Sequence, residues 1–323
     1  MLRLSAVAAL GALALLSGCA SNDPAASPVS TGEGTSTPSS TRPDVITITS
    51  ADIPAMAPVA SVPGPGSPVR IVSLASGVGE TLAALGVGDR VVGRDETSQA
   101  PQIQAAEIVT QAHATSAERV LALAPDLVIV DAATSPPEAI AQITDAGVRV
   151  VAVPEAWTVA DIAGRTSAVA AAVGVPSSAA QSVTEQATSP VTLPGGRPPR
   201  VAFLYLRGNS AIYLIGGAGS GADAMIHAAG GIDAGAEAGF DGFVPLTAEA
   251  VAELDPDVLL VMTKGLESVG GPEGLAQLPG VAQTRAGSER RIVAVDDTLL
   301  LSFGPRTSAL AHALAEALAS QAA

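Results

Sequence analysis

The sequence contains few side chains that could ligate a metal or a cofactor, and their positions separate them. Its 323 residues include three histidines. His113 follows a short apolar stretch and precedes a predicted helix, which is the strand-end position where ligands bind in open α/β sheets. His227 and His312 fall inside predicted helices, so we expect them to be structural or exposed to solvent. Position therefore favours His113 as a ligand-binding imidazole, although a structural role stays open.

The two tyrosines differ in the same way. Tyr205 lies within a continuous apolar strand and is expected in the core. Tyr213 lies in a short predicted strand between the loop 208–211 and a glycine-rich turn at 216–222. Its phenol could reach a ligand from that turn, but position alone does not decide between this role and packing.

The single cysteine, Cys19, ends the export signal that we predict at residues 1–18. Arg3 precedes an apolar run over 4–16, which is too short to span a bilayer and ends in LSGC, the bacterial lipobox. We expect cleavage before Cys19, whose thiol would then carry a diacylglycerol anchor on the outer face of the cytoplasmic membrane. The alternatives are an ordinary secretory signal with an incidental cysteine, or a buried apolar helix.

Composition excludes several function classes. Acidic residues outnumber basic ones by 31 to 16, a net charge of −15, and loss of Arg3 gives 15 − 31 = −16. Nucleic acid is therefore not expected as a partner, because phosphate binding needs a basic face. One cysteine excludes a disulfide framework and a thiolate zinc site.

No enzyme motif is convincing. The sequence lacks Walker A, HExxH and GxSxG patterns, and no isolated carboxylate pair stands out. Residues 217–222 match the dinucleotide pattern GxGxxA, but a lone match is weak and an exported protein has no ready supply of NAD. We expect a tight strand-to-helix turn there instead.

The elements that position these residues alternate between strand and helix from residue 68, which predicts α/β architecture. Expected strands cover 70–74, 90–92, 107–110, 127–130, 148–153, 200–206, 212–215, 258–262 and 292–295. Expected helices cover 80–85, 116–123, 136–146, 158–173, 176–188, 221–229 and 307–320.

The predicted organisation is Cys19 and a flexible Ser/Thr/Pro tether over 19–66, an N-terminal lobe over 67–174, a connecting helix over 175–190 and a C-terminal lobe over 191–323. An edge strand at 45–50 is the alternative to a tether that is flexible throughout.

An internal repeat favours two related lobes. Residues 116–130 align with 247–261 at a constant offset of 131. Each copy has a Ser/Thr cap, an acid in the first helical turn, a Pro-Asp stop and an apolar strand. The alternative is that this order is common in βα units and recurs by chance.

Together these features resemble the substrate-binding lipoproteins of ABC importers for iron–siderophores, vitamin B12 and heme, and most of all the actinobacterial hemin-binding lipoproteins. The resemblance covers about residues 68–320. It rests on RIVSL at 70–74, GRDET at 93–97, the repeat at 116–130, GLESVGG at 265–271, LPG at 278–280 and SFGPRT at 302–307. It implies a helical-backbone periplasmic-binding-protein fold, with two three-layer α/β lobes joined by a single long helix.

The resemblance also implies a ligand and its contacts. His113 and Tyr213 match the two axial ligands of the heme iron, heme being the transported ligand. Where some relatives have an arginine two residues after the tyrosine, this chain has Ile215, so Arg207 is the candidate support for the phenolate. Candidate partners for the heme propionates are Arg94, Arg207 and Arg306.

The implied partners are an ABC permease with its ATPase, and heme donor proteins. Glu118 and Glu249, equivalent acids of the repeat, match the family's permease-docking residues, and they also suit the first turn of a helix. We expect a non-catalytic monomer. The alternatives are a siderophore or corrinoid carrier of the same fold, an extracellular enzyme or adhesion module, and a heme relay between cell-wall proteins without a permease.

Overall fold

The computed structural model describes residues 43–111 and 114–322, so the predicted signal peptide, Cys19 and His113 lie outside the described residues. The N-terminal lobe contains a parallel sheet with the strand order β4-β3-β2-β7-β8. Its strands are β2 (Ile71–Ser73), β3 (Val91–Arg94), β4 (Glu107–Ile108), β7 (Leu127–Val130) and β8 (Arg149–Ala152).

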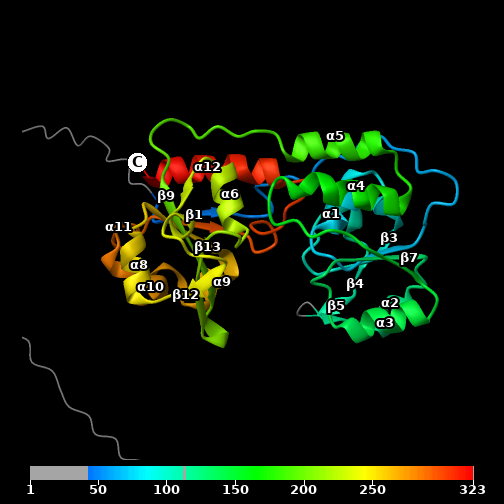
Figure 1. Ribbon diagram of the computed structural model, residues 1–323, viewed down its shortest axis with the longest axis horizontal. Coiled ribbons are helices and arrows are strands. Elements are labelled where there is room, and N and C mark those ends of the chain that lie inside the picture. Colours follow the sequence, from blue (N-terminus) through cyan, green and yellow to red (C-terminus); the bar gives the residue numbers. More distant parts are fainter. Residues whose placement is uncertain (1–42, 112–113, 323) are drawn as a thin grey trace, which may run out of the picture. The chain divides into compact units, whose positions relative to one another are not determined.

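Helices cover both faces of this sheet (Figure 1). One face packs against α1 (Val78–Ala84), α4 (Asp161–Val173) and α5 (Ser177–Ala187), and the other against α2 (Ala117–Ala122) and α3 (Pro137–Asp145). Side chains alternate along the strands, so Leu127 and Ile129 face the first layer while Val128 and Val130 face the second. Because both faces are covered here, β7 is apolar and buried along its whole length, as the sequence pattern predicted.

The C-terminal lobe has a mixed sheet with the order β1-β14-β13-β9-β10-β12, and β11 also pairs with β9. Strand β10 is antiparallel to β9 and β12, whereas the other pairs are parallel. The strands are β1 (Val45–Ile48), β9 (Arg200–Arg207), β10 (Ile212–Gly216), β11 (Ile232–Asp233), β12 (Phe243–Pro245), β13 (Val258–Met262) and β14 (Ile292–Val295).

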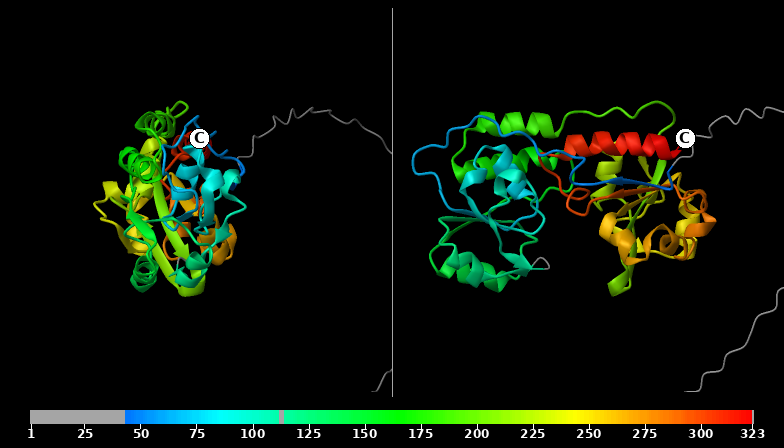
Figure 2. Two further views of the ribbon diagram at one scale, coloured as in Figure 1. Left: turned by 90° about the vertical axis from the view of Figure 1, so that its right-hand side faces the viewer. Right: turned by 180° about the vertical axis from the view of Figure 1, so that it is seen from behind.

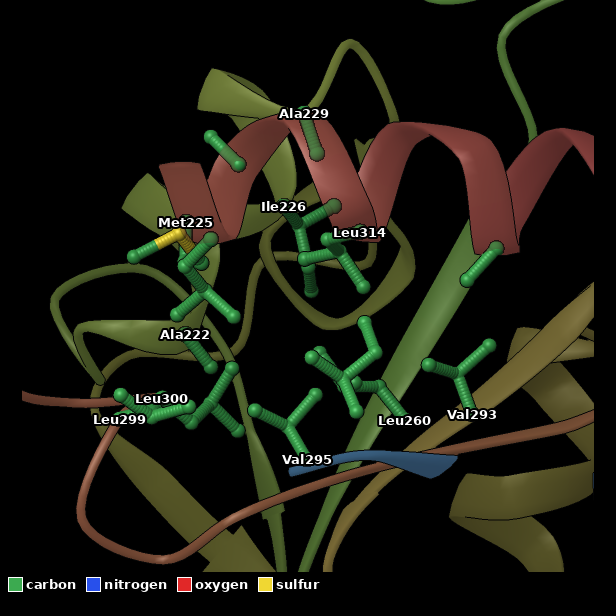
Figure 3. Close-up of a cluster of buried hydrophobic side chains, with 14 of the residues drawn as sticks. Ala222, Met225, Ile226, Ala229, Leu260, Val293, Val295, Leu299, Leu300 and Leu314 are labelled. Carbon is green, nitrogen blue, oxygen red and sulfur yellow. The ribbon is translucent and has the colours of Figure 1, made fainter. Parts of the chain in front are cut away.

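Two helical layers cover this second sheet as well. On one face lie α6 (Ala222–Ala228) and α12 (Thr307–Ala322), and on the other α7 (Ala234–Glu237), α8 (Ala248–Leu254), α9 (Thr263–Ser268), α10 (Gly271–Ala276) and α11 (Arg285–Ser288). Figure 3 shows the first of these interfaces, where Ile226 and Leu314 pack together above Leu260, Val293 and Val295. Within the described part of the chain, no helix is both long and apolar enough to cross a membrane.

Short segments complete the described chain. Four turns of 3₁₀ helix occur at Gly88–Arg90, Pro101–Ile103, Gly208–Ser210 and Val281–Gln283. A small antiparallel hairpin, β5 (Thr110–Gln111) and β6 (Ala114–Thr115), follows β4.

A strand lies within the expected tether. Strand β1 pairs in parallel with the whole of β14 and lies beneath α12 (Figure 2, right). Ile48 and Ile53 are almost fully buried in the C-terminal core. Within the predicted tether, Val45–Ile48 therefore forms a strand, because its apolar side chains complete a sheet edge. The alternative of an edge strand describes the structure.

The connection between the lobes is built from α5 and an extended segment. Helix α5 lies within the expected range 175–190 and packs on α4, with Val183 in the N-terminal core and Ala187 in the C-terminal core. Residues 188–199 then reach β9 without forming a helix or a strand. The chain also passes from one sheet to the other between β1 and β2.

The two copies of the repeat fold alike. The Ser116 hydroxyl accepts a hydrogen bond from the Arg119 N–H at 3.3 Å, and the Thr247 hydroxyl accepts one from the Ala250 N–H at 3.2 Å. Each cap begins a short helix that leads into a buried central strand, β7 or β13. The predicted caps and strands are thus in place in both lobes.

Candidate functional site

In each lobe, polar residues gather where the parallel strands end, which is the edge where open α/β sheets bind ligands. In the N-terminal lobe this edge forms a cavity of about 150 Å³. The cavity is lined by Leu74, Ser76, Asp95, Glu96, Thr97, Thr110, Asp131, Ala133 and Thr134.

The loop after β3 supplies the acidic wall of this cavity. Asp95 is 4% exposed and accepts hydrogen bonds from the hydroxyls of Thr97 and Ser98 and, at 2.8 Å, from the Thr97 N–H. Burial raises the pKa of Asp95 despite these hydrogen bonds. The Glu96 N–H donates to the Thr110 hydroxyl at 3.1 Å, which fixes the loop after β3 against the segment after β4.

A buried arginine from α4 joins two further loops. The Arg165 guanidinium donates to the Ser76 carbonyl at 2.7 Å and to the Asp131 carboxylate at 3.1 Å. Desolvation lowers the pKa of Arg165, and the charge of Asp131 opposes this shift. Asp131 also lines the cavity, so this ion pair lies at the cavity wall.

His113 lies outside the described residues, so the structure does not place its imidazole. The residues on either side of it are described. Thr110 of β5 lines the cavity, and the Thr115 N–H of β6 donates to the Ser135 carbonyl at 2.7 Å. The β5–β6 hairpin therefore starts at the same edge of the sheet as the cavity.

Tyr213 lies on β10 opposite Leu206 of β9. Its side chain is half-buried on the face of the sheet that packs against helices α7–α11. Its carbonyl accepts a hydrogen bond from the Leu246 N–H at 2.9 Å. Among the described residues, its hydroxyl makes no hydrogen bond. Tyr205 faces the other side of the sheet and packs edge-on against Phe243, with ring centroids 5.6 Å apart. Tyr205 therefore packs against the core, as predicted.

Arg207 does not support Tyr213 in this geometry. Side chains alternate along β9, so Arg207 shares the face of Tyr205, and its guanidinium lies 4.5 Å above the Tyr205 ring. It also pairs with the Asp297 carboxylate at 3.3 Å. The prediction that Arg207 stabilises the Tyr213 phenolate is therefore corrected, because the two side chains lie on opposite faces of the ribbon.

The other two candidate arginines form bonds inside the protein. Arg94 is 5% exposed and donates to the Ser98 carbonyl at 2.8 Å, and this hydrogen bond holds the loop after β3 in place. Arg306 is 8% exposed and pairs with Glu80 at 3.0 Å. Neither guanidinium lines the N-terminal cavity.

Sequence reasoning missed one cation at the C-terminal edge. Lys264 is exposed at the start of α9, directly after β13, and its backbone N–H donates to the Asp297 carboxylate at 2.9 Å. The Asp297 carboxylate therefore binds both the guanidinium of Arg207 and the backbone N–H of Lys264. The available signal was that Lys264 is the only lysine of the chain and follows a predicted strand.

The two candidate docking acids occupy equivalent places. Glu118 and Glu249 are both exposed in the first turns of α2 and α8. Within residues 43–111 and 114–322, no three His, Cys, Asp or Glu side chains lie close enough to hold a metal ion by themselves.

The chain is similar to known transport proteins. The profile of the periplasmic binding protein family matches residues 71–299. An uncharacterized ABC transporter substrate-binding lipoprotein, YvrC of Bacillus subtilis (strain 168), is 26% identical over 262 residues, which cover 78% of this chain and 80% of YvrC.

Solved structures of heme-binding proteins share the fold. The periplasmic heme-binding protein RhuT from Roseiflexus sp. RS-1 is 40% identical, with a TM-score of 0.72 over 79% of this chain and 99% of RhuT. The heme-binding protein HmuT is 33% identical, with a TM-score of 0.75 over 84% of this chain and 96% of HmuT. HmuT has also been solved with a histidine, a tyrosine or the arginine two residues after that tyrosine replaced by alanine. By its sequence and by its two α/β lobes, the chain belongs to the periplasmic binding protein family.

Proposed function

We propose that this protein is a membrane-anchored, extracytoplasmic hemin-binding protein that captures heme between its lobes and delivers it to an ABC permease. The observation that carries the proposal is the identity of 40% and 33% to two heme-binding proteins, RhuT and HmuT, each matched over more than nine-tenths of its length. A ligand carrier of this kind has no catalytic residues, in keeping with the transport role in the name of YvrC.

His113 and Tyr213 are the proposed axial ligands of the heme iron. The solved HmuT variants replace the same two residue types, and Tyr213 has a half-buried ring and a hydroxyl without a hydrogen-bond partner among the described residues. Phenolate and imidazole are both suitable ligands for heme iron. Ile215 stands two residues after Tyr213 and is fully buried. The phenolate would therefore be stabilised by the ferric iron rather than by a neighbouring guanidinium.

The charges at the two sheet edges orient the heme. The described residues that line the N-terminal cavity include Asp95 and Asp131 and no arginine or lysine, so they offer the propionates no cation. Arg207 and Lys264 lie at the C-terminal edge on either side of Asp297. We therefore assign the propionates to the C-terminal edge, with Arg207 and Lys264 as their partners, in place of Arg94 and Arg306.

The transport partners follow from the same proposal. YvrC is named an ABC transporter substrate-binding lipoprotein, and the lipobox ending at Cys19 supports a lipid anchor for this chain too. Glu118 and Glu249, exposed in both lobes, would pair with basic residues of the permease and set its orientation on the protein.

A hemin titration tests the ligand assignment. Purified protein should give a shifted Soret band at saturation, and His113→Ala and Tyr213→Phe should each alter its position and weaken binding. Two variants serve as matched controls: His312→Ala removes an exposed histidine, and Tyr205→Phe removes only a hydroxyl. Unchanged spectra and affinities for both site variants would reject the axial ligands.

The same fold could carry a siderophore or a corrinoid. Titrations with a ferric siderophore and with cobalamin, followed by tryptophan fluorescence of Trp157, separate these ligands from hemin. Tight binding of either without a response to hemin would replace the heme proposal.

A further inference from the structure

A second polar pocket lies in the C-terminal lobe, away from the edge assigned to heme. Its volume is about 490 Å³, and it lies between helix α6, strand β11 and helix α7. Strand β11 pairs with β9 at Arg200, the opposite end of β9 from Leu206, which pairs with Tyr213. The pocket's polar lining residues are Asp223, His227, Asp233 and Glu237.

Two aspartates of this pocket each have one oxygen in use and one without a partner. Asp233 is 8% exposed, and its Oδ1 caps α7 by accepting the Ala236 N–H at 2.5 Å. Asp223 accepts the Gly219 N–H on Oδ2 at 2.9 Å. Asp233 Oδ2 and Asp223 Oδ1 are buried and have no hydrogen-bond partner. Unpaired buried carboxylate oxygens are costly, so a counter-charge is expected beside them.

The surrounding charges do not supply that counter-charge. Arg200 is the nearest arginine in the strand register, but its guanidinium pairs with Glu237 at 3.0 Å. Burial and the negative charge of Asp223 raise the pKa of Asp233 to about 6, against the opposing effect of the backbone N–H groups. His227 lines the pocket but is exposed. The pocket therefore has an excess of negative charge.

We propose that Asp223 and Asp233 bind a divalent cation, Ca²⁺, in this pocket. Both orphaned atoms are carboxylate oxygens, the hard ligands that Ca²⁺ prefers, and backbone carbonyls and waters commonly complete its shell. The described residues contain no group of three His, Cys, Asp or Glu side chains that could hold a metal ion, so backbone carbonyls and waters would have to supply the remaining ligands. The ion would join the first turn of α6 to the β11–α7 corner and stabilise this lobe. This site does not depend on the heme proposal.

Thermal unfolding with and without Ca²⁺ tests the site. Extracellular Ca²⁺ modules bind with Kd of about 0.1–1 mM, so 10 mM Ca²⁺ should raise the Tm of the EDTA-treated protein by about 2–5 °C. Asp233→Asn and Asp223→Asn should abolish this shift. Asn keeps the cap of α7, so the Asp233→Asn variant should fold, and in EDTA its Tm should exceed that of the parent.

The exposed Asp241 is outside the pocket, and Asp241→Asn is the matched charge control that should keep the full Ca²⁺ response.

Three outcomes would overturn the proposal. The first is no Tm shift up to 10 mM Ca²⁺ in the parent protein. The second is an equal shift in Asp233→Asn. The third is a response to Zn²⁺ alone that disappears in His227→Ala, which would indicate a nitrogen-ligated site. The hemin titration is run on the same variants, and it should be unchanged whichever result is obtained with Ca²⁺.

Discussion

The guanidinium of Arg306 lies 3.0 Å from the carboxylate of Glu80, and both side chains are more than nine-tenths buried. Arg306 precedes α12 in the C-terminal lobe and Glu80 lies on α1 in the N-terminal lobe, so this ion pair joins the two lobes. The same Glu80 oxygen accepts the Gln99 N–H at 2.7 Å, and Arg306 also donates to the Ser50 hydroxyl at 2.9 Å. The interlobe contact is thereby connected to the loop that forms the acidic wall of the N-terminal cavity.

Breaking this pair should be costly because it leaves one buried charge alone. We expect Arg306→Met to lower the free energy of unfolding by about 3–5 kcal/mol. The double variant Arg306→Met with Glu80→Leu should lose markedly less, since no charge is stranded. Urea unfolding of the parent, both single variants and the double variant measures the difference. Additive losses would show that the two residues act independently.

The sequence predicted the features that local patterns determine. Asp126 and Asp257 are equivalent in the repeat, and each accepts a backbone N–H at the start of the neighbouring strand: Asp126 from Arg70 at 3.0 Å and Asp257 from Arg200 at 2.9 Å. In both copies the Ser/Thr residue predicted the start of the helix, the Pro-Asp pair predicted its end, and the apolar run predicted the buried strand that follows.

Contacts between distant residues could not be predicted in this way. Arg306 and Glu80 are 226 positions apart, and nothing in their local sequence distinguishes an arginine that joins two lobes from one that contacts a propionate. Likewise, Val45–Ile48 lies in a segment of tether-like composition, and it forms a strand only because β14 offers an open edge. Arg207 was assigned to Tyr213 by nearness in sequence, whereas strand alternation places it on the other face.

The glycine-rich turn at 216–222 requires glycine at position 217 because the backbone of Phe240 packs closely against it, and no bound nucleotide is needed to explain this residue. A Cβ at this position would lie 2.4 Å from the Phe240 carbonyl oxygen, which is backbone and has little room to move. We expect Gly217→Ala to cost about 3 kcal/mol, the upper end of the usual range for overpacking, because the clash is with backbone. Gly219 has φ of +78° and open space around its Cβ position, so Gly219→Ala should cost only about 1–2 kcal/mol, through backbone strain. Chemical denaturation compares them, and equal costs would contradict the steric explanation.

Lys264 and Arg207 should contribute to hemin affinity through the propionates. Under the proposed function, Lys264→Gln should weaken hemin binding by about 3–10-fold without moving the Soret band, because an exposed ion pair is worth about 1 kcal/mol. Arg207→Gln should act in the same direction. Arg119→Gln, which removes an exposed arginine paired with Glu107, is the control. The effect of Lys264→Gln should vanish with hemin dimethyl ester, and persistence with the ester would assign Lys264 a different role.

Asp233 should make stability fall as pH rises through the mildly acidic range. Its pKa is raised from 3.8 to about 6 in the folded protein. Below pH 4 both states are protonated and carry no penalty. Between about pH 4 and 6 the folded state holds a proton that the unfolded state has released, so folding loses stability as pH increases. The full penalty, about 3 kcal/mol, is reached above pH 7. In EDTA, the free energy of unfolding of Asp233→Asn minus that of the parent should therefore grow from near zero at pH 4 to this value at pH 7.5. A difference that does not vary with pH would mean that Asp233 is ionised at its ordinary pKa.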